Sequence, residues 1–254
     1  MEHRKYDRLD VAVAETEGDL GVAVAEAFAE AVRDALTKKE SIAVILATGN
    51  SQLSFIRAAI ERDDIDWSRI TVLHMDEYLW MSADHPASFR RWMRENVGER
   101  VALGAFEGVR GDHEPVEEEL QRYDRLLRDL DPDICVMGIG ENGHLAFNDP
   151  PADFEAKDLI RVVDMDELSR KQQVGEGHFE SLDETPRQAL SLTIPALLRP
   201  RVVLVGVPEV RKAMAVKAAL EGPVTPRCPA SILREQSHAK LFLDRQSASL
   251  LEAQ

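Results

Sequence analysis

The sequence predicts an α/β fold built around a doubly wound, mostly parallel sheet with helices on both faces. Two observations support this fold class: short, nearly continuous apolar runs recur along the chain, and segments with helical periodicity lie between them. Strands without polar alternation are typical of a parallel sheet that is covered on both faces. Ligands of such sheets bind beyond the carboxyl ends of the strands. The predicted strands are Ile42–Ala47, Ile70–Met75, Asp133–Gly138, Leu159–Asp164, Ala189–Ile194, Arg201–Gly206 and Ala239–Asp244.

Three segments carry apolar residues at helical spacing. Leu20–Thr37 is the longest, and Val116–Leu130 directly follows a proline. Pro208–Glu221 begins with a proline, which the first turn of a helix tolerates, and ends at a Gly-Pro pair. Because strands and helices alternate without a repeat or a linker, we expect residues 1–254 to form a single three-layer domain.

The segment from about residue 149 to residue 186 does not follow this alternation. It contains Pro150-Pro151, Gly175 and Gly177, and many charged side chains surround its one predicted strand. An excursion of this composition in a compact domain predicts a lid or a binding loop, and an ordinary surface excursion is the alternative.

Composition argues against several classes of function. The 254 residues carry 31 basic and 46 acidic side chains, and the net charge of −15 disfavours nucleic acids and anionic membranes as partners. No apolar run approaches the ~20 residues of a membrane span. The charged N-terminus lacks the apolar core of a signal peptide. Cys135 and Cys228 lie in no metal-binding spacing, so we expect a cytoplasmic protein without disulfides.

Polar residues directly follow the first predicted strand. Thr48-Gly49-Asn50-Ser51 leads from that strand into a segment with apolar helical periodicity. Backbone N–H groups at the start of a helix can bind an anion without a cationic side chain. A simple N-cap at Asn50 or Ser51 is the alternative interpretation.

Two adjacent carboxylates follow the second strand. Asp76 and Glu77 precede Tyr78, and one of them would suit a general base if it were desolvated beside a carbonyl compound. A solvated strand end is the alternative. His85, in the following loop, is more often a structural residue than a catalytic one.

The third polar segment follows the strand DICVMG and reads GIGENGHLAFNDPP. Gly138-x-Gly140-x-x-Gly143 matches a dinucleotide fingerprint, with Asp164 at the end of the next strand, so an NAD-binding protein is an alternative. A dinucleotide site needs a long helix after the third glycine, whereas two prolines arrive here within about two turns. His144 and Asp149 fit acid–base chemistry better.

Together the three segments resemble the glucosamine-6-phosphate deaminase family. LATGNS, HMDEYLW with a following HPASF, and GIGENGHLAFNDP occur in the order and approximate spacing of that family. The resemblance continues through PRQALSLTIPALL, VPEVRKAMAVKAALEG and PASIL, and covers most of residues 40–245. The related 6-phosphogluconolactonases share the glycines and the histidine that follow this strand, but the AFN tripeptide favours the deaminases.

The resemblance implies a Rossmann-like fold, no metal and no organic cofactor, and the conversion of glucosamine 6-phosphate to fructose 6-phosphate and ammonia. Asp76 falls on the family's general base, which moves a proton between C2 and C1 of the open sugar. His144 falls on the residue that helps to open the ring. The implied phosphate-binding positions are Thr48, Gly49, Asn50, Ser51 and Lys212, and further candidates for substrate contact are Glu77, Gly143 and Arg170. The expected partner is a small sugar phosphate, with a homo-oligomer left open.

Two departures from the family pattern flank His144. Asn142 stands where the deaminases carry an aspartate, and Asp149 stands where they carry a glutamate. In the family these acids tune the imidazole. Asn142 can orient the ring but cannot transfer a proton, and Asp149 is one methylene shorter. These changes leave open a related sugar-phosphate isomerase, a 6-phosphogluconolactonase-like hydrolase and a non-catalytic sugar-phosphate sensor.

Two further stretches bear on the substrate and on regulation. The stretch SRKQQVGEGHF, with Gln172 and Gln173, is expected to shape a different substrate pocket. Residues 151–158 are acidic where regulated bacterial deaminases carry a basic cluster for an N-acetylated sugar phosphate. We therefore expect no activation by such an effector.

Overall fold

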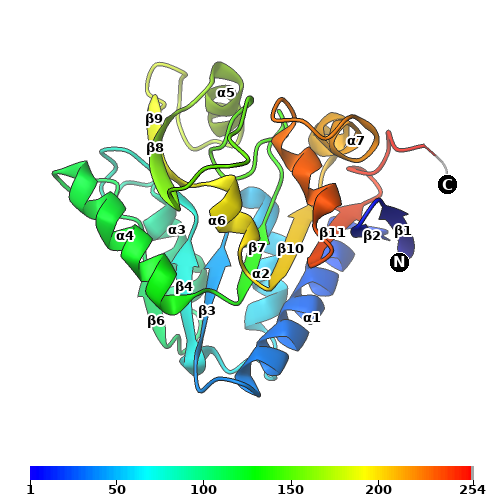
Figure 1. Cartoon of the computed structure of the whole chain (residues 1–254), viewed down its shortest axis with the longest axis horizontal. Coiled ribbons are helices and arrows are strands. Elements are labelled where there is room, and N and C mark those ends of the chain that lie inside the picture. Colours follow the sequence, from blue (N-terminus) through cyan, green and yellow to red (C-terminus); the bar gives the residue numbers. More distant parts are fainter. Residues whose placement is uncertain (253–254) are drawn as a thin grey trace.

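The central element of the structure, a computed structural model that describes residues 1–252, is an eight-stranded sheet (Figure 1). Its strands lie in the order β1-β2-β11-β10-β7-β3-β4-β6, and all neighbours pair in parallel except β1 and β2. The bounds of these strands are β1 Glu2–Tyr6, β2 Leu9–Ala14, β3 Ile42–Leu46, β4 Ile70–His74, β6 Ala105–Glu107, β7 Ile134–Met137, β10 Val202–Val207 and β11 Ala239–Asp244.

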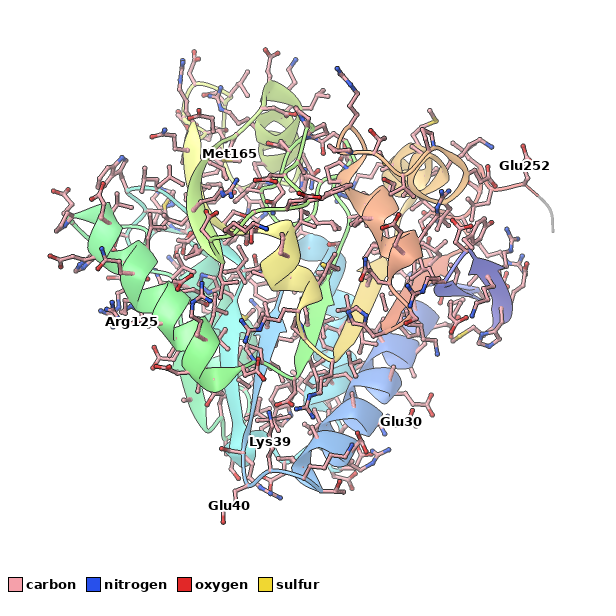
Figure 2. All side chains as sticks on the ribbon, viewed as in Figure 1. Glu30, Lys39, Glu40, Arg125, Met165 and Glu252 are labelled. Atoms are coloured by element: carbon pink, nitrogen blue, oxygen red, sulfur yellow. The ribbon has the colours of Figure 1, made fainter. Side chains whose placement is uncertain are left out.

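Helices cover both faces of this sheet, which confirms the predicted fold class. Along β3, Val44 and Leu46 pack in one core with α1 and α2, whereas Ile45 packs in the other core with α4, α6 and α7. This alternation is that of a sheet buried on both sides. The helix bounds are α1 Glu17–Leu36, α2 Leu53–Ile60, α3 Phe89–Met93, α4 Val116–Leu130, α5 Glu167–Gly175, α6 Ile194–Leu198 and α7 Ala213–Glu221. Charged side chains such as Glu30 on α1 and Arg125 on α4 are exposed on the outer surface (Figure 2).

The longest helix shows how local sequence and packing cooperate. Thr16 and Asp19 form a capping box at the start of α1, which pairs N–H groups that the helix itself leaves without acceptors. Gly21 lets α1 approach α2 closely, since a Cβ there would lie 2.5 Å from the carbonyl carbon of Ser54. Phe28 packs edge to face against Phe55 of α2, with ring centroids 5.6 Å apart. Helix α1 is thereby held against the sheet and α2.

Two predicted strands belong to a different sheet. Leu159–Asp164 and Ala189–Ile194 were expected in the parallel sheet, and that expectation is wrong. They form β8 (Ile160–Asp164) and β9 (Gln188–Leu192), which pair antiparallel with each other, and β9 pairs antiparallel with the short β5 (Asp76–Tyr78). An apolar run of five residues reads the same in a parallel strand as in an antiparallel strand, so composition alone cannot separate them.

The small sheet positions the chemistry. Figure 1 shows β8, β9 and α5 beyond the upper end of the main sheet, where the strands of the parallel sheet reach their carboxyl ends. Asp76 pairs with Ser191 in this small sheet, so the carboxylates that follow β4 are held by an ordered strand instead of a solvated strand end. Within residues 1–252, every helix is too short or too polar to cross a lipid bilayer.

Candidate active site

A cavity that is open to solvent lies at the carboxyl end of the parallel strands. The turns after β3, β4 and β7 line it from the main sheet, α5 and the residues after it line a second side, and Lys212 lines a third. The three polar segments that were identified from the sequence therefore meet in one place.

The loop after β3 forms one end of the cavity. Thr48, Gly49 and Ser51 line it, and Gly49 adopts a φ of 96°, a conformation that favours glycine. A 3-10 turn, Asn50–Gln52, then leads into α2, and the first N–H groups of such a helical start have no acceptor inside the helix. Asn50 lies outside the cavity lining and donates from Nδ2 to the backbone carbonyl of Glu176 at 3.2 Å. Gln52 also lines the cavity, and its Nε2 donates to the Ser51 Oγ at 3.2 Å.

Lys212 supplies a buried cation opposite this loop. It ends the 3-10 turn Val210–Lys212 before α7, lines the cavity and is 2% exposed. Burial lowers the pKa of its ammonium group, and the nearby charge of Glu176 partly opposes this. The ammonium has no hydrogen bond or ion pair with any other residue in the described part of the chain. A buried cation without a bonded partner is suited to bind an anion from solution.

Asp76 adds a carboxylate to the lining of the cavity. It is 7% exposed and lines the cavity, and no residue in the range 1–252 donates a hydrogen bond to its carboxylate. Burial, together with the neighbouring charge of Glu77, raises the pKa of Asp76 from 3.8 to about 8. A carboxylate that is neither solvated nor paired is a stronger base than usual, as a general base near neutral pH requires.

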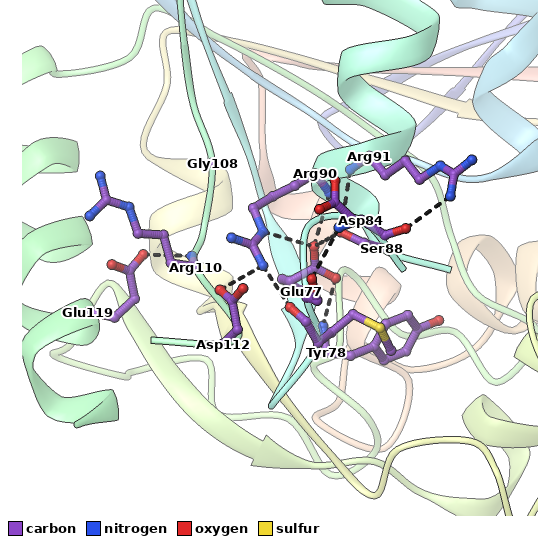
Figure 3. Close-up of polar contacts among 12 residues, drawn as sticks. Glu77, Tyr78, Asp84, Ser88, Arg90, Arg91, Gly108, Arg110, Asp112 and Glu119 are labelled. Atoms are coloured by element: carbon purple, nitrogen blue, oxygen red, sulfur yellow. Dashed lines mark hydrogen bonds and ion pairs between the residues drawn. The ribbon is translucent and has the colours of Figure 1, made fainter. Parts of the chain in front are cut away.

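Glu77 points away from the cavity. Adjacent side chains of a strand face opposite sides, and Glu77 accepts hydrogen bonds from the Ser88 hydroxyl at 2.7 Å and the Arg90 backbone N–H at 3.0 Å (Figure 3). Its carboxylate also lies 3.5 Å from the Arg90 guanidinium, which in turn pairs with Asp112 at 2.8 Å. The structure therefore gives Glu77 a role in anchoring β5 beside Asp76, and not the substrate contact that the sequence suggested.

His144 is held by a hydrogen-bonded cluster. Its Nδ1 lies 2.9 Å from the Ser169 hydroxyl and 3.3 Å from Asp149 Oδ1, and the Ser169 hydroxyl also donates to Asp149. Asn142 donates from Nδ2 to Asp149 at 2.9 Å and accepts the backbone N–H of His144 at 3.0 Å. The shorter side chain of Asp149 therefore reaches the imidazole, and Ser169, which was not among the candidate site residues, bridges the two.

This cluster fixes the form of the imidazole. Burial alone would raise the pKa of Asp149, but its hydrogen bonds with His144, Ser169 and Asn142 bring the pKa below 3.8, so the carboxylate is ionised. Because the ionised Asp149 accepts on the Nδ1 side, we place the proton of the neutral ring on Nδ1. Nε2 then has no hydrogen-bond partner in the described chain. Gly140 makes room for the ring, since a Cβ there would lie 2.2 Å from Nε2.

Two predicted substrate contacts lie outside the cavity lining. Gly143 adopts a φ of 85° in the turn before His144, and a Cβ there would lie 3.3 Å from Cys228 Sγ, so its glycine serves the turn. Arg170 donates from its guanidinium to the backbone carbonyls of Leu182 and Thr185, which ties α5 to the following loop. The geometry does not support a direct contact between either residue and a substrate.

The segment after β8 contributes several residues to the cavity. Gln172 and Gln173 line the cavity, in agreement with the expectation that their stretch shapes it. Glu176 and His178 belong to the same stretch and also line the cavity, although neither was singled out from the sequence. Whether this segment closes as a lid remains a prediction.

The glycine-rich turn does not hold a dinucleotide in the usual way. No helix begins between His144 and Leu159, so the long helix that a dinucleotide fingerprint requires is absent from this part of the described chain. Residues 1–252 also bring together no group of three or more His, Cys, Asp or Glu side chains that could hold a metal ion. The arrangement instead offers a base, an oriented imidazole and an anion-binding loop.

Comparisons with known proteins support this interpretation. The family model of glucosamine-6-phosphate isomerases and 6-phosphogluconolactonases matches residues 15–243. The glucosamine-6-phosphate deaminase of Exiguobacterium sibiricum is 34% identical over 212 residues, which cover 84% of this chain and 82% of that protein. The deaminase of Streptococcus pneumoniae strain Hungary19A-6 is 31% identical over 207 residues, 82% of this chain and 86% of that one.

Solved structures show the same fold. A monomeric glucosamine-6-phosphate deaminase superimposes with a TM-score of 0.86 at 28% identity and covers 95% of this chain and 99% of its own. The 6-phosphogluconolactonase of Thermotoga maritima superimposes with a TM-score of 0.74 at 21% identity, over 92% of this chain and 98% of its own. At that identity, the likeness to the lactonase is one of fold alone.

Proposed function

Because the chain belongs to the family of glucosamine-6-phosphate isomerases and 6-phosphogluconolactonases, we propose that this enzyme converts glucosamine 6-phosphate and water to fructose 6-phosphate and ammonia. One observation carries the proposal. The desolvated carboxylate of Asp76 and the oriented imidazole of His144 line the same cavity as Ser51 and Lys212. A base, an acid and an anion site in one small cavity suit a substrate that carries a phosphate and an acidic C–H bond.

The phosphate would bind between the loop after β3 and Lys212. The backbone N–H groups at the start of the helical turn and the Ser51 hydroxyl offer hydrogen bonds, and Lys212 offers a charge. This local positive site is what a protein with a net charge of −15 needs in order to attract an anionic substrate.

Ring opening would use His144. The imidazole can transfer a proton between the anomeric hydroxyl and the ring oxygen through Nε2, while Nδ1 stays bonded to Ser169 and Asp149. The ionised Asp149 stabilises the imidazolium that forms when the ring takes up a proton. Asn142 holds this pair in place without taking part in proton transfer.

Isomerisation would use Asp76. Its carboxylate removes the proton from C2 of the open-chain aldose, a proton passes from the ammonium group on C2 to O1 to give an enolamine, and the carboxyl group then delivers its proton to C1. The product is an imine at C2, and water hydrolyses it to the ketone with release of ammonia. The raised pKa of Asp76 suits both halves of this transfer, since the same group must accept and return a proton near neutral pH.

A lactone hydrolysis is the second candidate. It is favoured by the fold shared with 6-phosphogluconolactonases and by Asn142, which stands where the deaminase pattern has an acid. In that reaction the imidazole of His144 would activate water against a lactone carbonyl, and Asp76 would have no C–H bond to break. Proton exchange at C2 therefore separates the two candidates.

The test measures ammonia release from glucosamine 6-phosphate beside hydrogen exchange at C2 in deuterated buffer. We expect both in the wild type, and neither in Asp76→Asn, which keeps the shape of the side chain but not the base. Exchange without ammonia would point to an isomerase, and hydrolysis of 6-phosphogluconolactone alone would point to the lactonase. Sugar-phosphate binding without any turnover would indicate a non-catalytic sensor.

We further propose a cytoplasmic location, supported by two free cysteines, Cys135 and Cys228, both buried. The proposed partner is the sugar phosphate itself. A homo-oligomer stays open, and one structural relative is described as monomeric.

A further inference from the structure

A carboxylate of the protein lies in the proposed phosphate site. Glu176 follows α5, its side chain is 7% exposed, and it lines the cavity together with Gly49, Ser51 and Lys212. Its Oε2 lies 3.9 Å from the position that a Cβ on Gly49 would take, which places the carboxylate beside the anion-binding loop. The mechanism proposed above gives this carboxylate no task.

The contacts of Glu176 are those that an oxyanion ligand would make. Its Oε1 accepts a hydrogen bond from Gln172 Nε2 at 2.9 Å and lies 3.5 Å from an Arg211 guanidinium nitrogen. Its Oε2 lies 3.5 Å from His178 Nε2, and its backbone carbonyl accepts from Asn50 Nδ2 at 3.2 Å. Groups from α5, from the loop after β3 and from the turn before α7 therefore converge on one residue.

The charge of Glu176 is matched to the cations around it. Burial would raise the pKa of this carboxyl, but the His178 imidazole 3.5 Å away and the charge of Lys212 bring the pKa below 4.5, so the group is ionised. Glu176 is in turn the principal group that raises the pKa of Lys212 against the effect of burial. The charge of the cation proposed for the phosphate is thus partly offset by a nearby carboxylate that forms no direct ion pair with it.

A phosphate that entered this site would meet a carboxylate of the same charge. At the short distances involved, repulsion between two desolvated anions is substantial, so the carboxylate has to leave when the phosphate binds. The backbone permits this movement. Gly175 and Gly177 flank Glu176, and a Cβ on either glycine would have no atom within 4 Å.

We propose that Glu176 is an internal competitor for the phosphate group of the substrate, and that its displacement from Arg211 and from the neighbourhood of Lys212 sets the affinity of the enzyme for sugar phosphates. This inference rests on the proposed function, because it takes the cavity between Ser51 and Lys212 as the phosphate site. It makes Glu176 a residue that determines affinity, and it leaves the proton transfers to Asp76 and His144.

The test compares Glu176→Gln with Glu180→Gln, which removes a charge of the same sign from an exposed position on the same segment. Isothermal titration with inorganic phosphate should give a dissociation constant about tenfold lower for Glu176→Gln than for the wild type, and an unchanged value for Glu180→Gln. Glucosamine without a phosphate should show no such gain. Unchanged or weaker phosphate binding by Glu176→Gln would overturn the proposal, since a carboxylate that contacts the substrate directly gives that result.

Glu176→Asp supplies a second variant that keeps the charge but withdraws it by one methylene. We expect its phosphate affinity to lie between those of the wild type and Glu176→Gln, and an affinity below that of the wild type would contradict the competitor role. Ammonia release by the wild type tests the proposed function separately. Turnover without tighter phosphate binding by Glu176→Gln refutes only the competitor, whereas tighter binding without turnover refutes only the proposed reaction.

Discussion

Asp76→Asn should abolish turnover and at the same time make the protein more stable. The wild-type carboxylate is buried without a hydrogen bond from residues 1–252, and its pKa of about 8 in the folded protein stands well above 3.8. Folding therefore disfavours the ionised form. Asparagine has the same shape and carries no charge, so at every pH the variant folds without the free-energy cost of burying or protonating a carboxylate.

The sign and size of the effect follow from the two pKa values. Below about pH 4 the carboxyl is protonated in both states and costs nothing. Between pH 4 and pH 8 the unfolded state ionises and the folded state does not, so wild-type stability falls as pH rises. From pH 5 to pH 8 this spans three pH units at 1.36 kcal/mol each, which makes the advantage of Asp76→Asn grow by on the order of 4 kcal/mol and then level off.

Urea denaturation at pH 5, 7 and 9 measures this difference. Asp63→Asn is the matched control, since Asp63 is exposed and lies outside every ion pair in the described chain, and we expect its stability to follow the wild type at each pH. An advantage of Asp76→Asn that does not change between pH 5 and pH 9 would show that the carboxylate is not held at a raised pKa. The base assignment would then lose its electrostatic support.

Three further outcomes follow from the same geometry. Exchange at C2 should rise about tenfold from pH 7 to pH 9 as the ionised fraction of Asp76, with a pKa of about 8, grows, and a flat profile would contradict this. Gly140→Ala should lower turnover at least about a hundredfold because the new methyl group would lie 2.2 Å from the His144 ring. Gly18→Ala is the control, since a Cβ there meets its nearest atom at 3.7 Å, and it should leave turnover unchanged. Steady-state kinetics of the two variants test this. Ser169→Ala should lower kcat about tenfold by removing the hydroxyl that bridges to His144, and unchanged kcat would make Ser169 a bystander.

Sequence patterns predicted five strands of the main sheet and missed others, among them β2, although five of its six residues are buried. The runs that became β3, β4, β7, β10 and β11 are almost entirely apolar, and all of them lie in the parallel sheet as expected. The edge strand β1 reads EHRKY, and its exposed, charged face carries no strand signal. β5 reads DEY, so its carboxylates resemble a loop until its pairing with β9 is known.

The same limit applies to the site. Asp76, His144 and the loop at Thr48 could be predicted because each directly follows a buried strand, and the carboxyl ends of parallel strands meet at one edge. Ser169 and Glu176 come from a polar segment where serine and glutamate are ordinary surface residues. Only the folding of α5 over the cavity gives them partners, and that packing is set by contacts distant in sequence.

The contacts of Asn142 offer a testable explanation for an amide, instead of the aspartate of the family pattern, at the centre of this cluster. Asn142 Nδ2 donates to Asp149 at 2.9 Å and to Asp166 at 3.0 Å. An aspartate there would place a third carboxylate beside these two, and one of the three would have to stay protonated.

Asn142→Asp should therefore be less stable than the wild type by about 1 to 3 kcal/mol at pH 8, with a smaller loss at pH 5, where protonation relieves the repulsion. Urea unfolding at both values measures it, with Gln121→Glu, the same change of amide to acid at an exposed position on α4, as the control. Equal stability at pH 8 would mean that the cluster tolerates a third carboxylate. A larger loss at pH 8 than at pH 5 would mean that the amide of Asn142 helps to keep Asp149 ionised beside His144.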